Sequence, residues 1–153
     1  MADPSSFDTE RAHKFFSAYC FNSAWEFIDK PKRTSSENEQ MIQYTLASLW
    51  HWSQRPDSTE KNLSIGYWQA ARVYALAGEA DNARKYAQLC LDITPTDDTF
   101  YLGYAHEAMA RAQFLSRRKE EAQSHLSEAR EQAKMVASAE NKKLLEDDLD
   151  SLG

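Results

Sequence analysis

The stretch Tyr67–Pro95, YWQAARVYALAGEADNARKYAQLCLDITP, decides the fold predicted for this chain. Its apolar residues recur every three or four positions, which is typical of two amphipathic helices. Gly78 ends the first helix and Pro95 closes the second, as these residue types commonly do. A stripe of small residues on the second helix comprises Ala83, Ala87 and Cys90. Because small side chains let helices approach closely, the stretch predicts a tight helix pair.

The same stretch resembles a tetratricopeptide repeat over nearly its whole length. The matching positions are two aromatic residues, a pair of small residues, the turn glycine, the small stripe and the closing proline: Tyr67, Tyr74, Ala70, Ala71, Gly78, Ala83, Ala87, Cys90 and Pro95. In that family each repeat is a helix pair, and successive pairs stack into a superhelix with a concave inner groove. The resemblance therefore implies stacked antiparallel helix pairs with a binding groove.

A second, weaker unit covers Phe114–Ala129, FLSRRKEEAQSHLSEA. Its small residues Ala122 and Ala129 lie 39 residues after their counterparts in the first unit. The family spacing is about 34, so we expect an extension near the start of the preceding helix. Arg117 stands where the turn glycine is expected. The phrases CFNSAW, WHW, YWQAARVYALAG and YAHEAMARA also resemble an uncharacterised bacterial family of tetratricopeptide-like proteins, which implies no particular activity.

Helical periodicity extends over most of the chain, and no segment shows the sustained alternation that is typical of strands. We predict an all-α fold, an α-α superhelix of about seven helices, in a single domain of 153 residues. The predicted helix pairs cover residues 8–54, 63–93 and 98–136, and a C-terminal capping helix covers 139–150. Ser36, with a glutamate three positions later, is the predicted N-cap of the second helix. An acidic stretch, Glu146–Asp148, lies near the end of the chain.

The charge of the chain argues against several classes of partner. The formal net charge is −6 at pH 7, with a pI near 5.2, so phosphate backbones and anionic lipid surfaces are repelled. The basic run Arg117–Lys119 is too short for a nucleic-acid patch. The first residues contain neither a signal-peptide pattern nor a long apolar run. We therefore expect a cytoplasmic protein that binds neither nucleic acid nor membrane.

Sequence motifs for metal binding and catalysis are sparse. Glu10-x-x-His13 is the only Glu-x-x-His in the chain, whereas a carboxylate di-iron bundle needs two. The sequence contains no glycine-rich phosphate loop before a helix and no nucleophile motif. We therefore expect neither a metal nor a cofactor, and we assign no catalytic residue.

The inner face of the first helix of each pair is the predicted binding groove. It comprises Ile65, Trp68, Arg72 and Leu76 on one helix and Tyr104, Glu107, Arg111 and Leu115 on the next. Trp, Tyr and Arg are enriched in binding hot spots, because flat rings bury area and guanidinium groups hold carboxylates. The leading hypothesis is a protein-interaction module that binds a peptide or a helix of a partner. Alternatively, Glu107 and Arg111 form an ordinary helical ion pair, and Trp68 packs against the first helix.

A second hypothesis is a pocket between the N-terminal helix pair and the repeats. Its candidate lining is Asn22, Trp25, His51 and Trp52, together with Trp68 and Glu107. A pocket with convergent polar groups favours a small-molecule sensor or a cryptic enzyme. Self-association through an exposed aromatic face is a third hypothesis.

The segment LASLWHWSQRP, residues 46–56, places His51 between two tryptophans. At helical spacing Trp50 and Trp52 lie about 200° apart, so they cannot both face the imidazole. We predict that they pack their helix against its two neighbours, one on each side. His51 has no carboxylate at helical spacing, so a catalytic role for it needs a partner from another helix.

Overall fold

A computed structural model describes residues 6–153 and has an all-α fold in that part of the chain. Its seven helices are α1 (Thr9–Ile28), α2 (Ser35–Gln54), α3 (Glu60–Leu76), α4 (Ala80–Ile93), α5 (Thr99–Leu115), α6 (Lys119–Lys134) and α7 (Ala139–Asp150). The prediction of an all-α fold with about seven helices is confirmed. Within residues 6–153, none of the helices has both the length and the apolar character that a membrane span requires.

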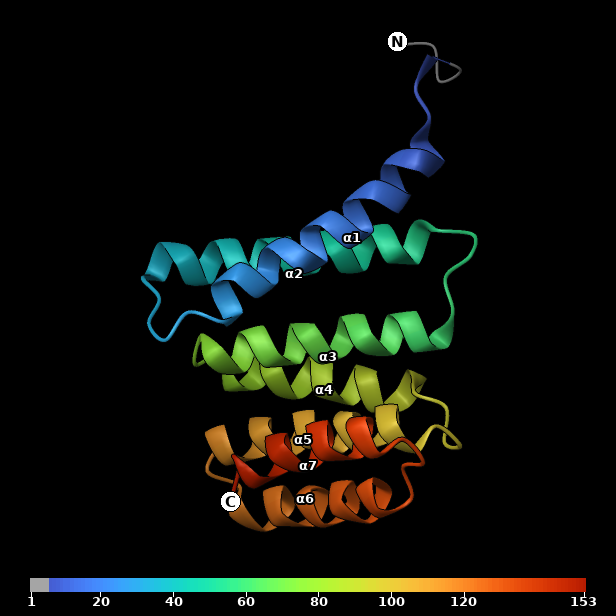
Figure 1. The fold of residues 1–153 in the computed structure, drawn as a ribbon. Coiled ribbons are helices and arrows are strands. Elements are labelled where there is room, and N and C mark those ends of the chain that lie inside the picture. The colour runs from blue at the N-terminus through green and yellow to red at the C-terminus, as the bar shows by residue number, and fades with distance from the viewer. Residues whose placement is uncertain (1–5) are drawn as a thin grey trace.

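The helices form antiparallel pairs that stack in one row (Figure 1). α1 packs on α2, α3 on α4 and α5 on α6, and neighbouring pairs meet where α2 contacts α3 and α4 contacts α5. The first helices of the pairs also contact one another, α1 with α3 and α3 with α5. We call the side formed by α1, α3 and α5 the inner face.

The turns inside the second and third pairs have the same geometry. Gly78 has φ 79° and Arg117 has φ 59°, so both residues are in the left-handed region. In each turn the next backbone N–H donates to a carbonyl five residues earlier, from Glu79 to Tyr74 and from Arg118 to Gln113. This is the bond that closes a helix with a left-handed residue. The two pairs therefore repeat at the backbone level with the spacing found in the sequence.

Small residues make the close contacts between helices. Those of the second helices are fully buried or nearly so: Ala83, Ala87 and Cys90 on α4, and Ala122, Ala129 and Ala133 on α6. Side chains of this size let helix axes come near the short end of the usual 8–10 Å range, about 8 Å. The small stripe identified in the sequence is thus the packing surface of each pair.

Two helix starts differ from the prediction. Thr34, not Ser36, is the N-cap of α2, and it exchanges reciprocal hydrogen bonds with Glu37. α3 begins three residues earlier than predicted, because Thr59 and Asn62 form the same kind of reciprocal cap. Both starts are fixed by polar side chains, which apolar periodicity does not reveal.

The end of α2 supports the prediction for the two tryptophans only in part. Trp50 is 55% exposed, although its ring meets the His13 ring of α1 edge to face at 5.2 Å. Trp52 lies under the guanidinium of Arg55, whose central carbon is 3.9 Å from the ring centroid. The face of α2 toward α1 carries Ser48 instead, which is buried and donates a hydrogen bond to the carbonyl of Ser17 at 2.7 Å. A tryptophan on that face would hold the two helices apart.

α7 does not continue the row of helices. It folds back and contacts both α5 and α6, and it crosses in front of α5 in Figure 1. Leu145 and Leu149 of α7 are fully buried. A Cβ on Gly103 of α5 would lie 2.5 Å from Leu145 Cδ2, so this glycine allows the close contact. The predicted C-terminal capping helix is present, but it covers part of the inner face.

Candidate functional site

A cavity of about 300 Å³ opens on the inner face where four helices meet. Its lining comprises Trp25 from α1, Ser64, Ile65 and Trp68 from α3, Phe100, Tyr101 and Tyr104 from α5, and Leu144 and Asp148 from α7. We call it the aromatic cavity, because five of these nine side chains are Trp, Tyr or Phe.

The rings of the aromatic cavity hold one another in fixed orientations. Trp25 stacks on Trp68 with a centroid distance of 6.0 Å. The edge of one ring meets the face of the other between Trp68 and Tyr104, at 5.5 Å, and between Phe100 and Tyr104, at 5.2 Å. Stacked and edge-to-face pairs are the favourable geometries for aromatic rings. The packing of Trp68 against the first helix, one of the predicted alternatives, is therefore present and forms one side of the cavity.

Three of the eight predicted groove residues line this cavity: Ile65, Trp68 and Tyr104. Trp25, which was predicted for the pocket, lines it as well. Leu76 instead packs into the apolar cluster around Ile28 and Val73. Leu115 is 40% exposed at the end of α5. The cavity therefore does not extend to the C-terminal ends of α3 and α5, where the predicted groove residues Leu76 and Leu115 lie.

The other predicted pocket residues lie elsewhere within residues 6–153. Asn22 is exposed on α1 and does not line the cavity. The Nδ1 atoms of His51 and His13 lie 2.8 Å apart, between the ends of α2 and α1. Trp52 is covered by Arg55. The prediction of one pocket that contains His51, Trp25 and Trp68 is therefore wrong.

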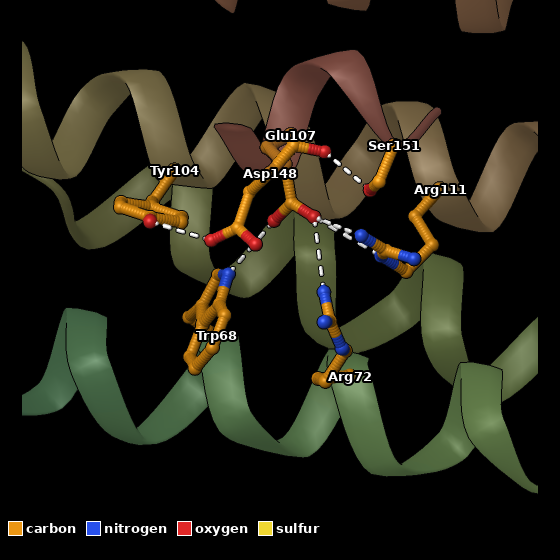
Figure 2. Close-up of polar contacts among 7 residues, drawn as sticks. All are labelled: Trp68, Arg72, Tyr104, Glu107, Arg111, Asp148 and Ser151. Carbon is orange, nitrogen blue, oxygen red and sulfur yellow. Dashed lines mark hydrogen bonds and ion pairs between the residues drawn. The ribbon is translucent and has the colours of Figure 1, made fainter. Parts of the chain in front are cut away.

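Glu107 of α5 is fully buried and connects α5 to α3 (Figure 2). Its Oε2 accepts a hydrogen bond from Trp68 Nε1 at 2.9 Å. Its Oε1 accepts from Arg72 Nη1 at 3.2 Å and from Arg111 Nη2 at 2.8 Å. The predicted ion pair between Glu107 and Arg111 exists, but its carboxylate is buried. Neither guanidinium is presented to a partner as the groove hypothesis assumes, because both already hold Glu107.

The charged groups around Glu107 mainly hold neighbouring side chains in position. Burial and the charge of Arg111 lower the pKa of Arg72, whereas Glu107 and Asp148 act in the opposite direction. Among the described residues, Arg72 Nε has no hydrogen-bond partner. Because a buried ion pair gains little beyond the cost of its desolvation, the main effect of the cluster is to hold the Trp68 indole in place.

Asp148 brings a carboxylate from α7 to the wall of the cavity. The hydroxyl of Tyr104 donates to its Oδ2 at 2.6 Å (Figure 2). Burial and this hydrogen bond raise the pKa of Tyr104 far above its usual range, so the phenol remains a donor. Within residues 6–153 Asp148 forms no ion pair, and Tyr104 is the side chain that bonds to its carboxylate.

A histidine pair lies between α5 and α6, outside the cavity. The Nδ1 atoms of His106 and His125 are 3.0 Å apart. One repeat earlier, the equivalent positions are Tyr67 and Tyr86, whose ring centroids are 6.3 Å apart. The pair thus replaces a packing contact between two aromatic rings. In the described part of the chain, no group of three or more His, Cys, Asp or Glu side chains is arranged to hold a metal ion.

Several lining residues were not predicted: Ser64, Phe100, Tyr101, Leu144 and Asp148. A signal existed for the two aromatic residues, because they lie within one helical turn of Tyr104 on the same helix. No local signal exists for the two residues of α7, because their place depends on how that helix folds back.

No family model, no curated protein and no solved structure matches this chain.

Proposed function

We propose that this chain is a protein-interaction module with tetratricopeptide-like repeats, and that its inner face binds a segment of a partner protein. The observation that supports this most is the aromatic cavity, which lies on the inner face between α1, α3, α5 and α7. Concave, mostly apolar sites with a few fixed polar groups are typical of binding sites. Trp and Tyr are also the residues that dominate binding hot spots.

The fixed position of Trp68 supports affinity as well. Its ring stacks on Trp25 and its N–H is bonded to the buried Glu107. A side chain that is ordered before binding loses little conformational entropy when a partner binds. Because α7 already covers part of α5, we favour an extended peptide over a long helix as the bound segment. One side chain of this peptide enters the aromatic cavity.

A peptide-selection experiment tests this proposal. Peptides selected from a random library on the wild-type protein are measured by fluorescence anisotropy against two variants. Ile65→Arg places a charged side chain at the cavity wall, and Gln123→Arg adds the same charge at an exposed position of α6. We expect Ile65→Arg to weaken binding about tenfold or more, since the longer side chain takes up the space that the peptide side chain needs. Equal binding to both variants, or selection of no peptide, contradicts the proposal.

A small-molecule sensor is the second candidate, and the volume of the cavity favours it. About 300 Å³ is at the lower end of the range for small-ligand sites. A metabolite that raises the melting temperature of the wild type but not of Trp25→Ala would support this function. The variant is placed at Trp25 because His51 does not line the cavity.

A further inference from the structure

The aromatic cavity combines aromatic rings with a single carboxylate. Trp25, Trp68 and Tyr104 contribute rings from three helices, and among the described residues Asp148 contributes the only charged group of the lining. Aromatic rings have negative faces that attract a cation within about 6 Å of the centroid, and Trp is the strongest of them. The chemistry of the lining is therefore complementary to a positive charge.

The cationic side chains around the cavity already have carboxylate partners. Arg72 and Arg111 hold Glu107. Lys61 lies 5.2 Å from the Tyr101 ring centroid and pairs with Asp98 at 3.6 Å. Asp148 differs, since among the described residues its carboxylate is bonded only to the neutral hydroxyl of Tyr104. Figure 2 shows this carboxylate beside Tyr104 and Trp68. Asp148 thus has no direct ion-pair partner, although its charge acts on Arg72 at longer range.

The number of hydrogen-bond acceptors decides which kind of cation fits. A lysine ammonium carries three N–H donors and an arginine guanidinium carries five. Beside Asp148 the acceptors of the lining are neutral phenol and hydroxyl oxygens, on Tyr101, Tyr104 and Ser64. Ser64 is 1% exposed, and its hydroxyl is bonded to Thr94 Oγ1 at 2.7 Å. Donors that lose water without gaining a new partner make binding unfavourable. A cation whose N–H groups are replaced by methyl groups avoids this loss.

We propose that the aromatic cavity binds an N-methylated ammonium group on a lysine side chain of the partner segment. This inference rests on the proposed function, and it adds the chemical identity of the anchoring side chain. A cavity of about 300 Å³ accepts one such head group but not a folded element. The peptide backbone stays outside the cavity.

The first test compares matched probes by calorimetry. They are the Nα-acetyl amides of trimethyllysine and lysine, a neutral tert-butyl isostere of the trimethyllysine amide, and free choline. We expect the trimethyllysine probe to bind at least about tenfold more tightly than both other amides, and to shift the Trp68 indole N–H signal in NMR spectra. Equal binding of the neutral isostere would overturn the proposal. Tighter binding of choline than of the trimethyllysine probe would overturn the assignment to a side chain.

The second test uses two charge-matched variants of α7. Asp148→Asn removes the carboxylate at the cavity and keeps an acceptor for Tyr104. Asp147→Asn removes the same charge one residue earlier, where Asp147 is exposed and pairs with Lys143. We expect Asp148→Asn to lower the affinity for the trimethyllysine probe about tenfold and Asp147→Asn to leave it unchanged. Circular dichroism of both variants checks that they fold. An equal effect of the two variants would overturn the proposal.

The two proposals fail in different ways. Suppose that Ile65→Arg weakens the binding of selected peptides but that trimethylation of their lysines does not raise their affinity. The ammonium inference is then wrong, and the proposed interaction module stands. If the trimethyllysine probe binds as expected but no peptide does, the proposed function is wrong and the cavity chemistry stands.

Discussion

Trp68 on α3 and Glu107 on α5 occupy equivalent positions of the two repeat units and are bonded to each other. The indole Nε1 donates to Glu107 Oε2 at 2.9 Å, across 39 residues of sequence. Arg72 and Arg111 are equivalent in the same way, and both contact Oε1 of the same carboxylate. One buried carboxylate therefore joins the inner faces of both units and sets the orientation of the ring that lines the aromatic cavity.

Glu107→Gln is expected to destabilise the protein strongly. The amide retains the shape of the side chain but leaves two half-buried guanidinium groups without their ion-pair partner. Removing one partner of a buried ion pair costs about 3 kcal/mol or more. Urea denaturation measures this loss. Asp147→Asn, at the exposed pair with Lys143, is the control and should cost about 0.5 kcal/mol or less. A similar loss in both variants would contradict the role of Glu107.

Arg117→Gly is expected to stabilise the protein. Arg117 has φ 59°, a conformation that costs a side-chain-bearing residue about 1–2 kcal/mol and glycine almost nothing. The greater freedom of glycine in the unfolded chain offsets part of this gain, so we expect a net increase of about 0.5–1 kcal/mol in the free energy of unfolding. Gly78→Arg, at the equivalent turn, is the reverse experiment and should lower it. Thermal unfolding shows whether each variant is more or less stable than the wild type. A loss of stability in Arg117→Gly would contradict the prediction.

Leu145→Ala is expected to loosen α7. Leu145 is fully buried and packs against Gly103, so its truncation should cost about 2–4 kcal/mol. Leu144→Ala is the control on the same helix, since Leu144 is 54% exposed. Hydrogen exchange resolved by segment should show faster exchange in α7 for Leu145→Ala than for Leu144→Ala. Unchanged exchange in α7 would mean that Leu145 does not hold the helix in place.

Stability is expected to fall when the pH drops below 6.5. Burial lowers the pKa of His106 and His125 from 6.5, the charge of His125 lowers that of His106 further, and Glu128 opposes both shifts. Below pH 6.5 the unfolded chain binds more protons than the folded chain, so the free energy of unfolding decreases. The contribution of the neutral rings is complete about one unit above pH 6.5, where the unfolded chain no longer binds these protons.

His106→Tyr/His125→Tyr copies the tyrosine pair of the preceding unit and tests this dependence. Both substitutions remove a group that titrates in this range, so the slope of stability against pH should become smaller between about pH 7.5 and 5.5. His51 keeps part of the slope, because burial and His13 lower its pKa as well. Chemical denaturation at a series of pH values gives the slope. An unchanged slope would exclude a contribution from the pair.

The candidate site was predictable only in part. Helical spacing places Trp68 and Tyr104 each on one face of its helix, and the tetratricopeptide resemblance predicts that this face is the inner one. The same spacing placed Glu107 beside Arg111, but it gave no indication that the carboxylate is buried. His51 was grouped with Trp25, although it lies next to His13 at the other side of the N-terminal pair. A helical pattern identifies which residues share a face, but not which helix covers that face.

The sequence by itself determined the helices, their turns and their repeat. Gly78, Pro95 and the small residues of α4 act on their immediate neighbours, so their effect is readable from local spacing. Only the tertiary structure decided where α7 lies, and with it the wall that contains Asp148. That position depends on contacts between residues far apart in the chain, such as Leu145 with Gly103. Such contacts depend on close packing between helices, which no pattern of neighbouring residues specifies.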